Sequence, residues 1–316
     1  MSAKLKNING EFVRNESGFR HWVTKDGSAG PTGDSGFKAE AGRYHLYVSY
    51  ACPWAHRTLI YRALKGLTDV ISVSVVHPLM PEESWVFGEY PGSTVDHING
   101  ANYLYENYLK VDSTYDGLVS VPVLWDKKRQ TIVNNESSEI IRMFNTAFDD
   151  FSNNEIDFYP ATLQAEIDRV NQPIYDNVNN GVYRAGFATT QTAYNNAYDR
   201  LFDTLDELEA RLSQQRYLVG DQLTEADWRL FVTLVRFDAV YYGHFKTNKK
   251  RIMDYPNLRG HTRELYQVPG VAETVNMDHI KLHYYGSHKS INPTRIVPKG
   301  PEIDLMQSHG RDKKFK

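Results

Sequence analysis

The chain has 316 residues, with 36 Lys or Arg and 39 Asp or Glu, so its formal net charge is −3. This near balance argues against a nucleic-acid-binding protein with a basic surface. The single cysteine, Cys52, excludes an internal disulfide and a metal site built from several cysteines. A lone thiol favours the reducing cytoplasm, and without a long apolar run we expect neither a membrane span nor secretion. The length predicts two domains.

The start of the chain predicts a strand, a helix and a second strand. Residues 1–42 are expected to form an irregular N-terminal extension, because turn residues fill their last part. Aromatic and branched residues predict a strand at Arg43–Tyr50. Pro53 suits the first position of a helix that ends at Gly66, and Val70–Val76 is a second strand. This βαβ pattern predicts parallel pairing of the two strands.

The rest of the first half predicts a small mixed sheet. A polar and aromatic insertion, 77–100, precedes a helix at Ala101–Val111. Val121–Trp125 and Thr131–Val133 flank a charged turn and predict a hairpin. A helix at Glu136–Asn145 follows. We therefore predict an α/β domain over residues 43–147.

The second half predicts helices only. Leucines at 201, 205, 208 and 212 form one apolar stripe, and residues 228–240 are apolar almost all round. Thr224 and Asp227 have the spacing of a capping box at the start of that central helix. We expect an all-helical domain over residues 156–276. Residues 277–316 are rich in Pro, His and Lys with little periodicity, which predicts a C-terminal tail packed on the structure.

Cys52 is the residue most suggestive of chemistry. It lies between the predicted strand and helix, in Tyr50-Ala-Cys-Pro-Trp-Ala-His-Arg57. The N-terminal end of a helix favours a thiolate over a thiol, and His56 or Arg57 would add to this if oriented toward the sulfur. Ala55 stands where a resolving cysteine would be, so an external thiol such as glutathione must clear a mixed disulfide. A buried, inert cysteine is the alternative, but the strand–Cys–Pro–helix context favours a nucleophile.

The Cys-Pro-Trp-Ala-His-Arg segment and the two predicted halves together resemble a cytosolic glutathione transferase, with a thioredoxin-like N-terminal domain and a helical C-terminal domain. Finer motifs resemble the glutathionyl-hydroquinone reductases, the xi class of this superfamily, which is similar to the omega class. These motifs run from about residue 43 to the C-terminus: Ser84-Trp-Val-Phe87, Val121-Pro-Val-Leu-Trp-Asp126, Asn135-Glu-Ser137, Gly181-Val-Tyr-Arg-Ala-Gly-Phe187 and Asn292-Pro-Thr-Arg-Ile-Val297.

The resemblance implies a reaction in two steps. Cys52 attacks the glutathionyl sulfur of a glutathionyl-hydroquinone, which releases the hydroquinone, and a second glutathione then reduces the mixed disulfide to oxidised glutathione. Glutathione is thus a co-substrate, and no metal is expected. The family also implies a homodimer. The expected ligands are glutathione and glutathionylated aromatic quinols, with no nucleic-acid or membrane partner.

The resemblance also implies the residues that bind glutathione. Pro122 matches the cis-proline turn that leaves the backbone of Val121 to pair with the cysteinyl part of glutathione, although an ordinary trans proline is the alternative from sequence alone. Ser137 suits the γ-glutamyl carboxylate and Glu136 the α-ammonium, where plain helix capping is the alternative. Trp85 matches a family tryptophan that packs on glutathione. Leu118 departs from the family, which often has an arginine there.

Tyrosines and histidines need separate weighing. Tyr183, Tyr284 and Tyr285 match the region where the family has substrate-site tyrosines, which stack on a quinol and donate protons. With 21 tyrosines in the chain, any one chosen without context is structural. The histidines at 279, 283 and 288 have a spacing that a metal site uses, but without acidic or thiol partners nearby we expect packing or solvated side chains.

Two other functions stay open from the sequence. One is an omega-like thioltransferase or dehydroascorbate reductase. The other is a non-catalytic binding module of the glutathione transferase fold, which Cys52 argues against because a binder needs no activated thiol.

Overall fold

The computed structural model describes residues 6–152, 154 and 156–315. Its contacts divide the chain into two compact units. The first, here called the sheet unit, comprises residues 15–157 and 273–283. The second, the helical unit, comprises residues 6–14, 158–272 and 284–315. In sequence the chain passes from one unit to the other at residue 157, and two short segments belong to a different unit from their neighbours in sequence.

The sheet unit contains a four-stranded mixed sheet in the order β4-β3-β5-β6. Strand β3 pairs parallel with β4 and antiparallel with β5, which pairs antiparallel with β6. This confirms the predicted βαβ unit and the predicted hairpin. The strands are β3 (Tyr44–Val48), β4 (Ser72–Val75), β5 (Val123–Asp126) and β6 (Thr131–Asn134).

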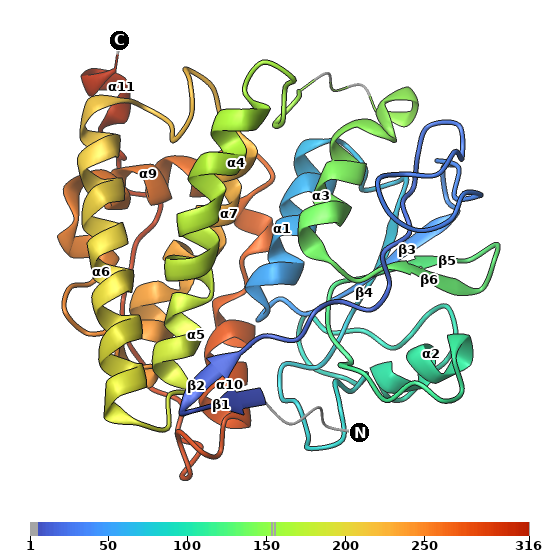
Figure 1. Ribbon diagram of the computed structural model, residues 1–316, viewed down its shortest axis with the longest axis horizontal. Helices are drawn as coiled ribbons and strands as arrows, with labels where there is room; N and C mark the ends of the chain where they lie inside the picture. Colours follow the sequence, from blue (N-terminus) through green and yellow to red (C-terminus); the bar gives the residue numbers. More distant parts are fainter. Residues whose placement is uncertain (1–5, 153, 155, 316) are drawn as a thin grey trace. The chain divides into compact units, whose positions relative to one another are not determined.

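Helices α1 and α3 pack together beside this sheet (Figure 1). All five residues of β3 and all four of β5 are buried, as expected for strands with both faces covered. The helices of this unit are α1 (Pro53–Leu64), α2 (Leu104–Val111), α3 (Ser137–Thr146) and the short η1 (Asp149–Phe151). Cys52 thus lies between the end of strand β3 and the start of helix α1.

The helical unit confirms the prediction of helices after residue 156. Helix α5 packs on α6, and α4 packs on α7 (Figure 1). The elements are α4 (Gln164–Pro173), η2 (Ile174–Asn179), α5 (Gly181–Gly186), α6 (Gln191–Gln214), α7 (Glu225–Arg236), η3 (Phe237–Tyr241), α8 (Tyr242–His244), η4 (Ile252–Asp254), α9 (Pro256–Tyr266) and α11 (Arg311–Lys314). The short η5 (Ala272–Thr274) and α10 (Met277–Ser287) follow α9.

Two local features of the helical unit follow from sequence. The Thr224–Asp227 capping box is present at the start of α7, where Asp227 accepts from the backbone N–H of Thr224 at 2.9 Å. Helix α4 widens after Pro173 into the π-helical turn η2, because proline has no N–H to bond the preceding turn. A second π-helical turn, η3, ends at Tyr241. The predicted apolar helix at 228–240 is therefore α7 with η3.

The prediction of an irregular N-terminal extension was wrong for its first part. Strands β1 (Lys6–Ile8) and β2 (Glu11–Val13) pair antiparallel as a hairpin. Its two-residue turn has both residues at positive φ, 52° at Asn9 and 86° at Gly10, as the favoured hairpin turns require. A Cβ on Gly10 would also lie 2.4 Å from the Thr190 hydroxyl oxygen. Strands of three residues are too short to show an alternating pattern in sequence.

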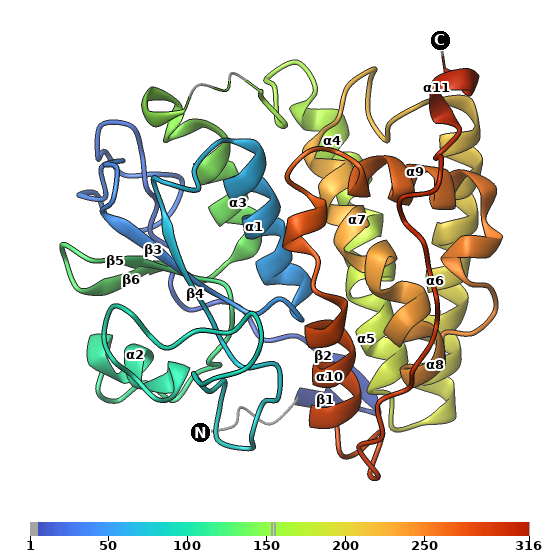
Figure 2. The same ribbon diagram turned by 180° about the vertical axis from the view of Figure 1, so that it is seen from behind.

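The tail also contains more structure than its sequence predicted. Helix α10 has a buried stripe formed by His279, Ile280, His283 and Tyr284. The sequence does not show this stripe, because a hydropathy pattern counts its two histidines as polar. The remainder of the tail runs along the helical unit to α11 (Figure 2), where the Gln267 amide donates to the Leu305 carbonyl at 2.8 Å. In the described part of the chain, every helix is too short or too polar to cross a bilayer.

Candidate active site

Cys52 lies at the N-terminal end of α1, directly after the sheet. It is the N-cap residue of α1, and its carbonyl accepts the first helical hydrogen bond from the His56 N–H at 3.0 Å. Pro53 occupies the first helical position, as predicted. Cys52 is half-buried. The sulfur therefore lies where the positive end of the helix dipole favours an anion.

The Val121-Pro122 peptide bond is cis, which confirms the prediction. The Cys52 Sγ lies 3.5 Å from the Val121 carbonyl oxygen. Val121 comes just before β5, and Cys52 follows β3, the strand that pairs with β5. Sheet pairing therefore brings the thiol and the Val121 backbone together, although 69 residues separate them in sequence.

His56 and Arg57, in the first turns of α1, each have a hydroxyl partner. The buried His56 ring hydrogen-bonds through Nε2 to the Thr274 hydroxyl at 2.8 Å. The buried Arg57 guanidinium lies 4.6 Å from the Trp54 ring centroid and donates to the Ser137 hydroxyl at 3.4 Å. Arg57 therefore places a positive charge at the start of α3.

Glu136 and Ser137 begin α3. The Glu136 carboxylate accepts from the Ser138 N–H at 3.0 Å and from the Ser17 hydroxyl at 3.0 Å. Burial opposes its ionisation, but hydrogen bonds from Ser138 and Ser17, together with the Arg57 charge, hold the pKa of Glu136 below its ordinary value. The start of α3 thus has both signs of charge: an ionised Glu136 and the Arg57 cation beside Ser137. The capping alternative is also realised, because Glu136 is the N-cap.

Trp85 is buried, with 8% of its surface exposed. The His283 ring stacks on it at 4.8 Å between centroids and 21° between planes. His283 Nδ1 lies 3.0 Å from the Pro78 carbonyl, so the ring donates there and its orientation is fixed. His279 is similarly bonded to the Pro91 carbonyl at 2.7 Å. These contacts confirm the expected packing role of both histidines.

The three sequence-predicted tyrosines separate into two groups within the helical unit. Tyr183 on α5 and Tyr284 on α10 are joined by a hydrogen bond of 2.5 Å between their hydroxyls. Tyr241 in η3 adds a second bond to the Tyr284 hydroxyl, at 2.9 Å. Tyr285 donates to the Ala239 carbonyl at 3.3 Å, and burial raises its pKa. The structure thus brings Tyr183 and Tyr284 together and directs Tyr285 elsewhere.

Leu118 cannot supply a cation, and its carbonyl accepts from the Tyr115 hydroxyl at 2.9 Å. Among the described residues, the cation that hydrogen-bonds a predicted glutathione-binding residue is Arg57, which donates to Ser137.

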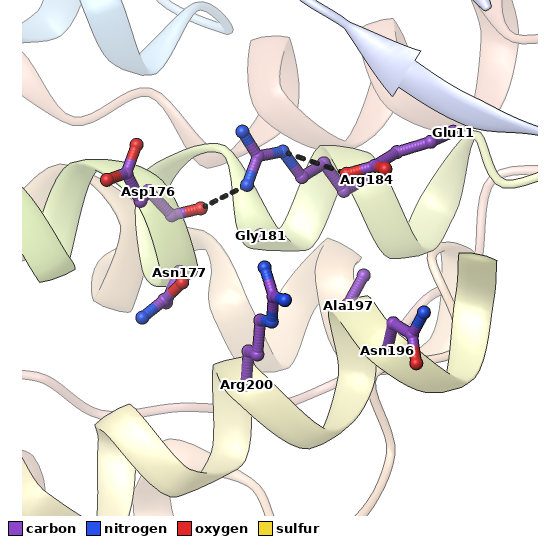
Figure 3. Close-up of a pocket in the computed structure, with 8 residues that line it drawn as sticks. All are labelled: Glu11, Asp176, Asn177, Gly181, Arg184, Asn196, Ala197 and Arg200. Carbon is purple, nitrogen blue, oxygen red and sulfur yellow. Dashed lines mark hydrogen bonds and ion pairs between the residues drawn. The ribbon is translucent and has the colours of Figure 1, made fainter. Parts of the chain in front are cut away.

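The helical unit also contains a polar pocket of about 50 Å³ (Figure 3), lined by Glu11, Asp176, Asn177, Gly181, Arg184, Asn196, Ala197 and Arg200. In it Arg184 donates to the Asp176 carbonyl at 3.3 Å and lies 3.7 Å from the Glu11 carboxylate. No sequence-predicted site residue lines it.

Within the described chain, the grouping with metal-ligand spacing is Glu264, His309 and Asp312, whose two carboxylates pair with Arg216 at 2.7 and 2.5 Å. The expectation of no metal stays a prediction.

Sequence reasoning missed Ser17, His283 and Tyr241 as neighbours of the candidate residues. Ser17 was assigned to an irregular extension, and His283 to a tail without periodicity. Tyr241 ends an apolar helix and differs from the other tyrosines only in its position after a π-helical turn. That turn is invisible in sequence, so no local signal could have found this hydroxyl.

Comparisons with known proteins agree with this geometry. Two models of the glutathione S-transferase family match the chain, the N-terminal domain over residues 51–147 and the C-terminal domain over residues 191–264. The glutathionyl-hydroquinone reductase YqjG of Escherichia coli K12 is 60% identical over 98% of this chain and 95% of its own length. The glutathionyl-hydroquinone reductase PcpF of Sphingobium chlorophenolicum is 56% identical over 95% of this chain and 93% of its own.

Solved structures show the same relationship. The glutathione-bound structure of YqjG superposes with a TM-score of 0.93, at 60% identity, over 94% of this chain and 97% of that one. A xi-class glutathione transferase from Natrialba magadii gives a TM-score of 0.89 at 52% identity, over 93% of this chain and 89% of that one. The fold is therefore a thioredoxin-like domain followed by a helical glutathione transferase domain. This chain belongs to the glutathione S-transferase family and, within it, to the glutathionyl-hydroquinone reductases.

Proposed function

We propose that this protein reduces glutathionyl-hydroquinones to hydroquinones with glutathione as the co-substrate. The observation that carries the proposal is the lone cysteine, Cys52, at the N-cap of α1 with its sulfur 3.5 Å from the Val121 carbonyl. The names of the relatives at 56–60% identity support the substrate class.

The reaction has two balanced steps. The Cys52 thiolate attacks the glutathionyl sulfur, a disulfide bond forms, and the bond between sulfur and the ring carbon breaks. The electron pair goes to the ring carbon, which takes one proton and leaves as hydroquinone. A second glutathione thiolate then attacks the mixed disulfide, giving oxidised glutathione and the free Cys52 thiolate. The absence of a second cysteine agrees with this order and predicts ping-pong kinetics.

We assign glutathione binding to residues of the sheet unit. The Val121 backbone next to Pro122 pairs with the cysteinyl part, and Trp85 packs on the tripeptide. The ionised Glu136 pairs with the α-ammonium, while the hydroxyl and the backbone N–H of Ser137, the first residue of α3, bind the γ-glutamyl carboxylate. The Arg57 charge beside Ser137 supports that assignment.

We assign the proton donor to the tyrosines of the helical unit. Tyr183 and Tyr284 share a hydrogen bond and are favoured over Tyr285, whose hydroxyl donates to a backbone carbonyl. We also propose that the protein is a homodimer and that it is located in the cytoplasm. The proposed domain limits are 1–42, 43–147, 156–276 and 277–316.

An omega-like thioltransferase or dehydroascorbate reductase is the main alternative. Assays with glutathionyl-menadiol, hydroxyethyl disulfide and dehydroascorbate, each with glutathione, compare the two directly. We expect the highest kcat/KM for glutathionyl-menadiol and no reduction by Cys52→Ser. If the quinol conjugate is the poorest of the three substrates, the proposal is wrong, and full turnover by Cys52→Ser would exclude the mechanism.

A further inference from the structure

Three tyrosine hydroxyls meet in the helical unit. The Tyr284 hydroxyl lies 2.5 Å from that of Tyr183 and 2.9 Å from that of Tyr241. The three rings also contact one another, with centroid distances of 5.4 to 6.5 Å. The hydroxyls therefore form a chain in which Tyr284 is the middle member.

The two outer tyrosines of this hydrogen-bonded group, Tyr183 and Tyr241, differ in how deeply they are buried. Tyr241 and Tyr284 are 0% and 1% exposed, whereas Tyr183 is half-buried. Burial raises the pKa of both Tyr241 and Tyr284 well above the ordinary value, and a negative charge on Tyr183 raises both further. Tyr241 and Tyr284 therefore keep their protons and remain donors, and Tyr183 is the more exposed end of the group.

A cation beside Tyr183 favours a negative charge on this residue. The Arg14 guanidinium lies 5.0 Å from the centroid of the Tyr183 ring, and its Nε donates to the Asn180 side chain at 2.6 Å. A cation at this distance stabilises a phenolate.

The other titratable groups near these tyrosines lie close to the buried Tyr241 and Tyr284. Arg236 on α7 lowers the pKa of both Tyr241 and Tyr284. The rings of His244 and His288 lie 6.4 and 5.4 Å from that of Tyr284. Among the described residues, Arg14 is the cation that lies against the Tyr183 ring.

We infer that Tyr241 is a positioning residue for proton transfer: it donates to Tyr284, so that Tyr284 donates to Tyr183 and stabilises the phenolate left when Tyr183 gives up its proton. This inference rests on the proposed reductase function. In that reaction the ring carbon released from sulfur takes the Tyr183 proton, and the phenolate regains a proton from solvent before the next turnover. Hydrogen bonds in a chain strengthen one another, so the remote hydroxyl of Tyr241 affects the acid.

The test is Tyr241→Phe, which removes one oxygen and keeps the ring. Tyr255→Phe is the matched control, because Tyr255 is also a buried tyrosine of the helical unit, with a 2.9 Å bond to Asp206. We measure single-turnover release of hydroquinone from glutathionyl-menadiol across pH. Because Tyr183 must be protonated to donate, the rate falls as pH rises through its ionisation. In Tyr241→Phe we expect this alkaline limb to move to higher pH and the plateau rate to fall roughly 10- to 100-fold.

Tyr255→Phe is expected to keep the wild-type pH profile. Ultraviolet titration of tyrosinate in a Cys52→Ser background gives a second readout: the difference between the curves with and without Tyr183→Phe isolates the Tyr183 ionisation, and this difference should move to higher pH when Tyr241→Phe is added. An unchanged rate and pH profile in folded Tyr241→Phe overturns the inference. If the wild-type protein does not release hydroquinone at all, the proposed function fails instead, so the two failures are distinguishable.

Discussion

Removing the charge of Glu136 should weaken glutathione binding without unfolding α3. In Glu136→Gln the amide oxygen can still accept from the Ser138 N–H, which keeps the N-cap bond. The stability cost should stay under about 1 kcal/mol, since replacing a cap outright typically costs about that much. The ion pair with the α-ammonium of glutathione is lost.

The size of the effect follows from the charge on that bond. Hydrogen bonds to charged groups contribute roughly 1.5–3 kcal/mol, which corresponds to about a 10- to 150-fold increase in Kd. The pKa of Glu136 lies below its ordinary value, so the carboxylate is ionised at neutral pH. The ion pair between Glu136 and the α-ammonium of glutathione is therefore present at neutral pH, and it is lost when acid protonates the carboxylate. Wild-type affinity should therefore decline only in acid, and the variant should lack this Glu136-dependent decline.

Calorimetric titration of glutathione into Cys52→Ser, with and without Glu136→Gln, measures the change. Glu139→Gln is the matched control: it removes the same charge from another residue in the first turn of α3, whose carboxylate pairs with Arg20. We expect this control to lose stability and to keep its Kd nearly unchanged, because the Glu139 carboxylate is engaged by Arg20 and by the Asn134 amide. An unchanged Kd in folded Glu136→Gln would refute the assignment of the α-ammonium to this carboxylate.

The stacked pair of His283 and Trp85 and the buried ion pair of Arg43 and Asp126 give two further predictions. His283→Ala should lower the free energy of unfolding by roughly 2–4 kcal/mol, from lost stacking, a cavity and an unpaired Pro78 carbonyl, and should raise the KM for glutathione. His283→Phe keeps the ring and should retain the KM; urea unfolding and steady-state kinetics measure both, and an equal KM in the two variants would show that the ring does not position Trp85. Arg43→Met should cost about 3–5 kcal/mol, because Asp126, 0% exposed and 2.5 Å from the guanidinium, would be left without its buried cation. Adding Asp126→Asn should recover part of that loss in urea unfolding, and a double variant no more stable than Arg43→Met would contradict this account of the pair.

Much of the sheet unit could be predicted because its signals are local. The strands are rich in aromatic and branched residues, Pro53 suits a helix start, and the charged turn before β6 indicates a hairpin. The position of Cys52 follows from those elements alone. The contact of Arg57 with Ser137 does not, because it depends on packing between α1 and α3.

The missed elements share a physical cause. The β1–β2 hairpin is too short for its periodicity to be seen, and α10 buries histidines, which a hydropathy pattern counts as polar. Tyr241 joins Tyr183 and Tyr284 only because η3 has a π-helical turn that changes which side chains share a face. Long-range contacts of this kind leave no spacing in the sequence, so the family resemblance could indicate two of these tyrosines and not the third.

The most direct test of the central claim is intact-protein mass spectrometry after mixing the enzyme with one equivalent of glutathionyl-menadiol and no free glutathione. The account predicts one added glutathione per chain on Cys52, an equal amount of released menadiol, and loss of the adduct as oxidised glutathione when glutathione is then supplied. Release of menadiol from an enzyme that stays unmodified at Cys52, or an adduct that glutathione does not remove, would contradict it.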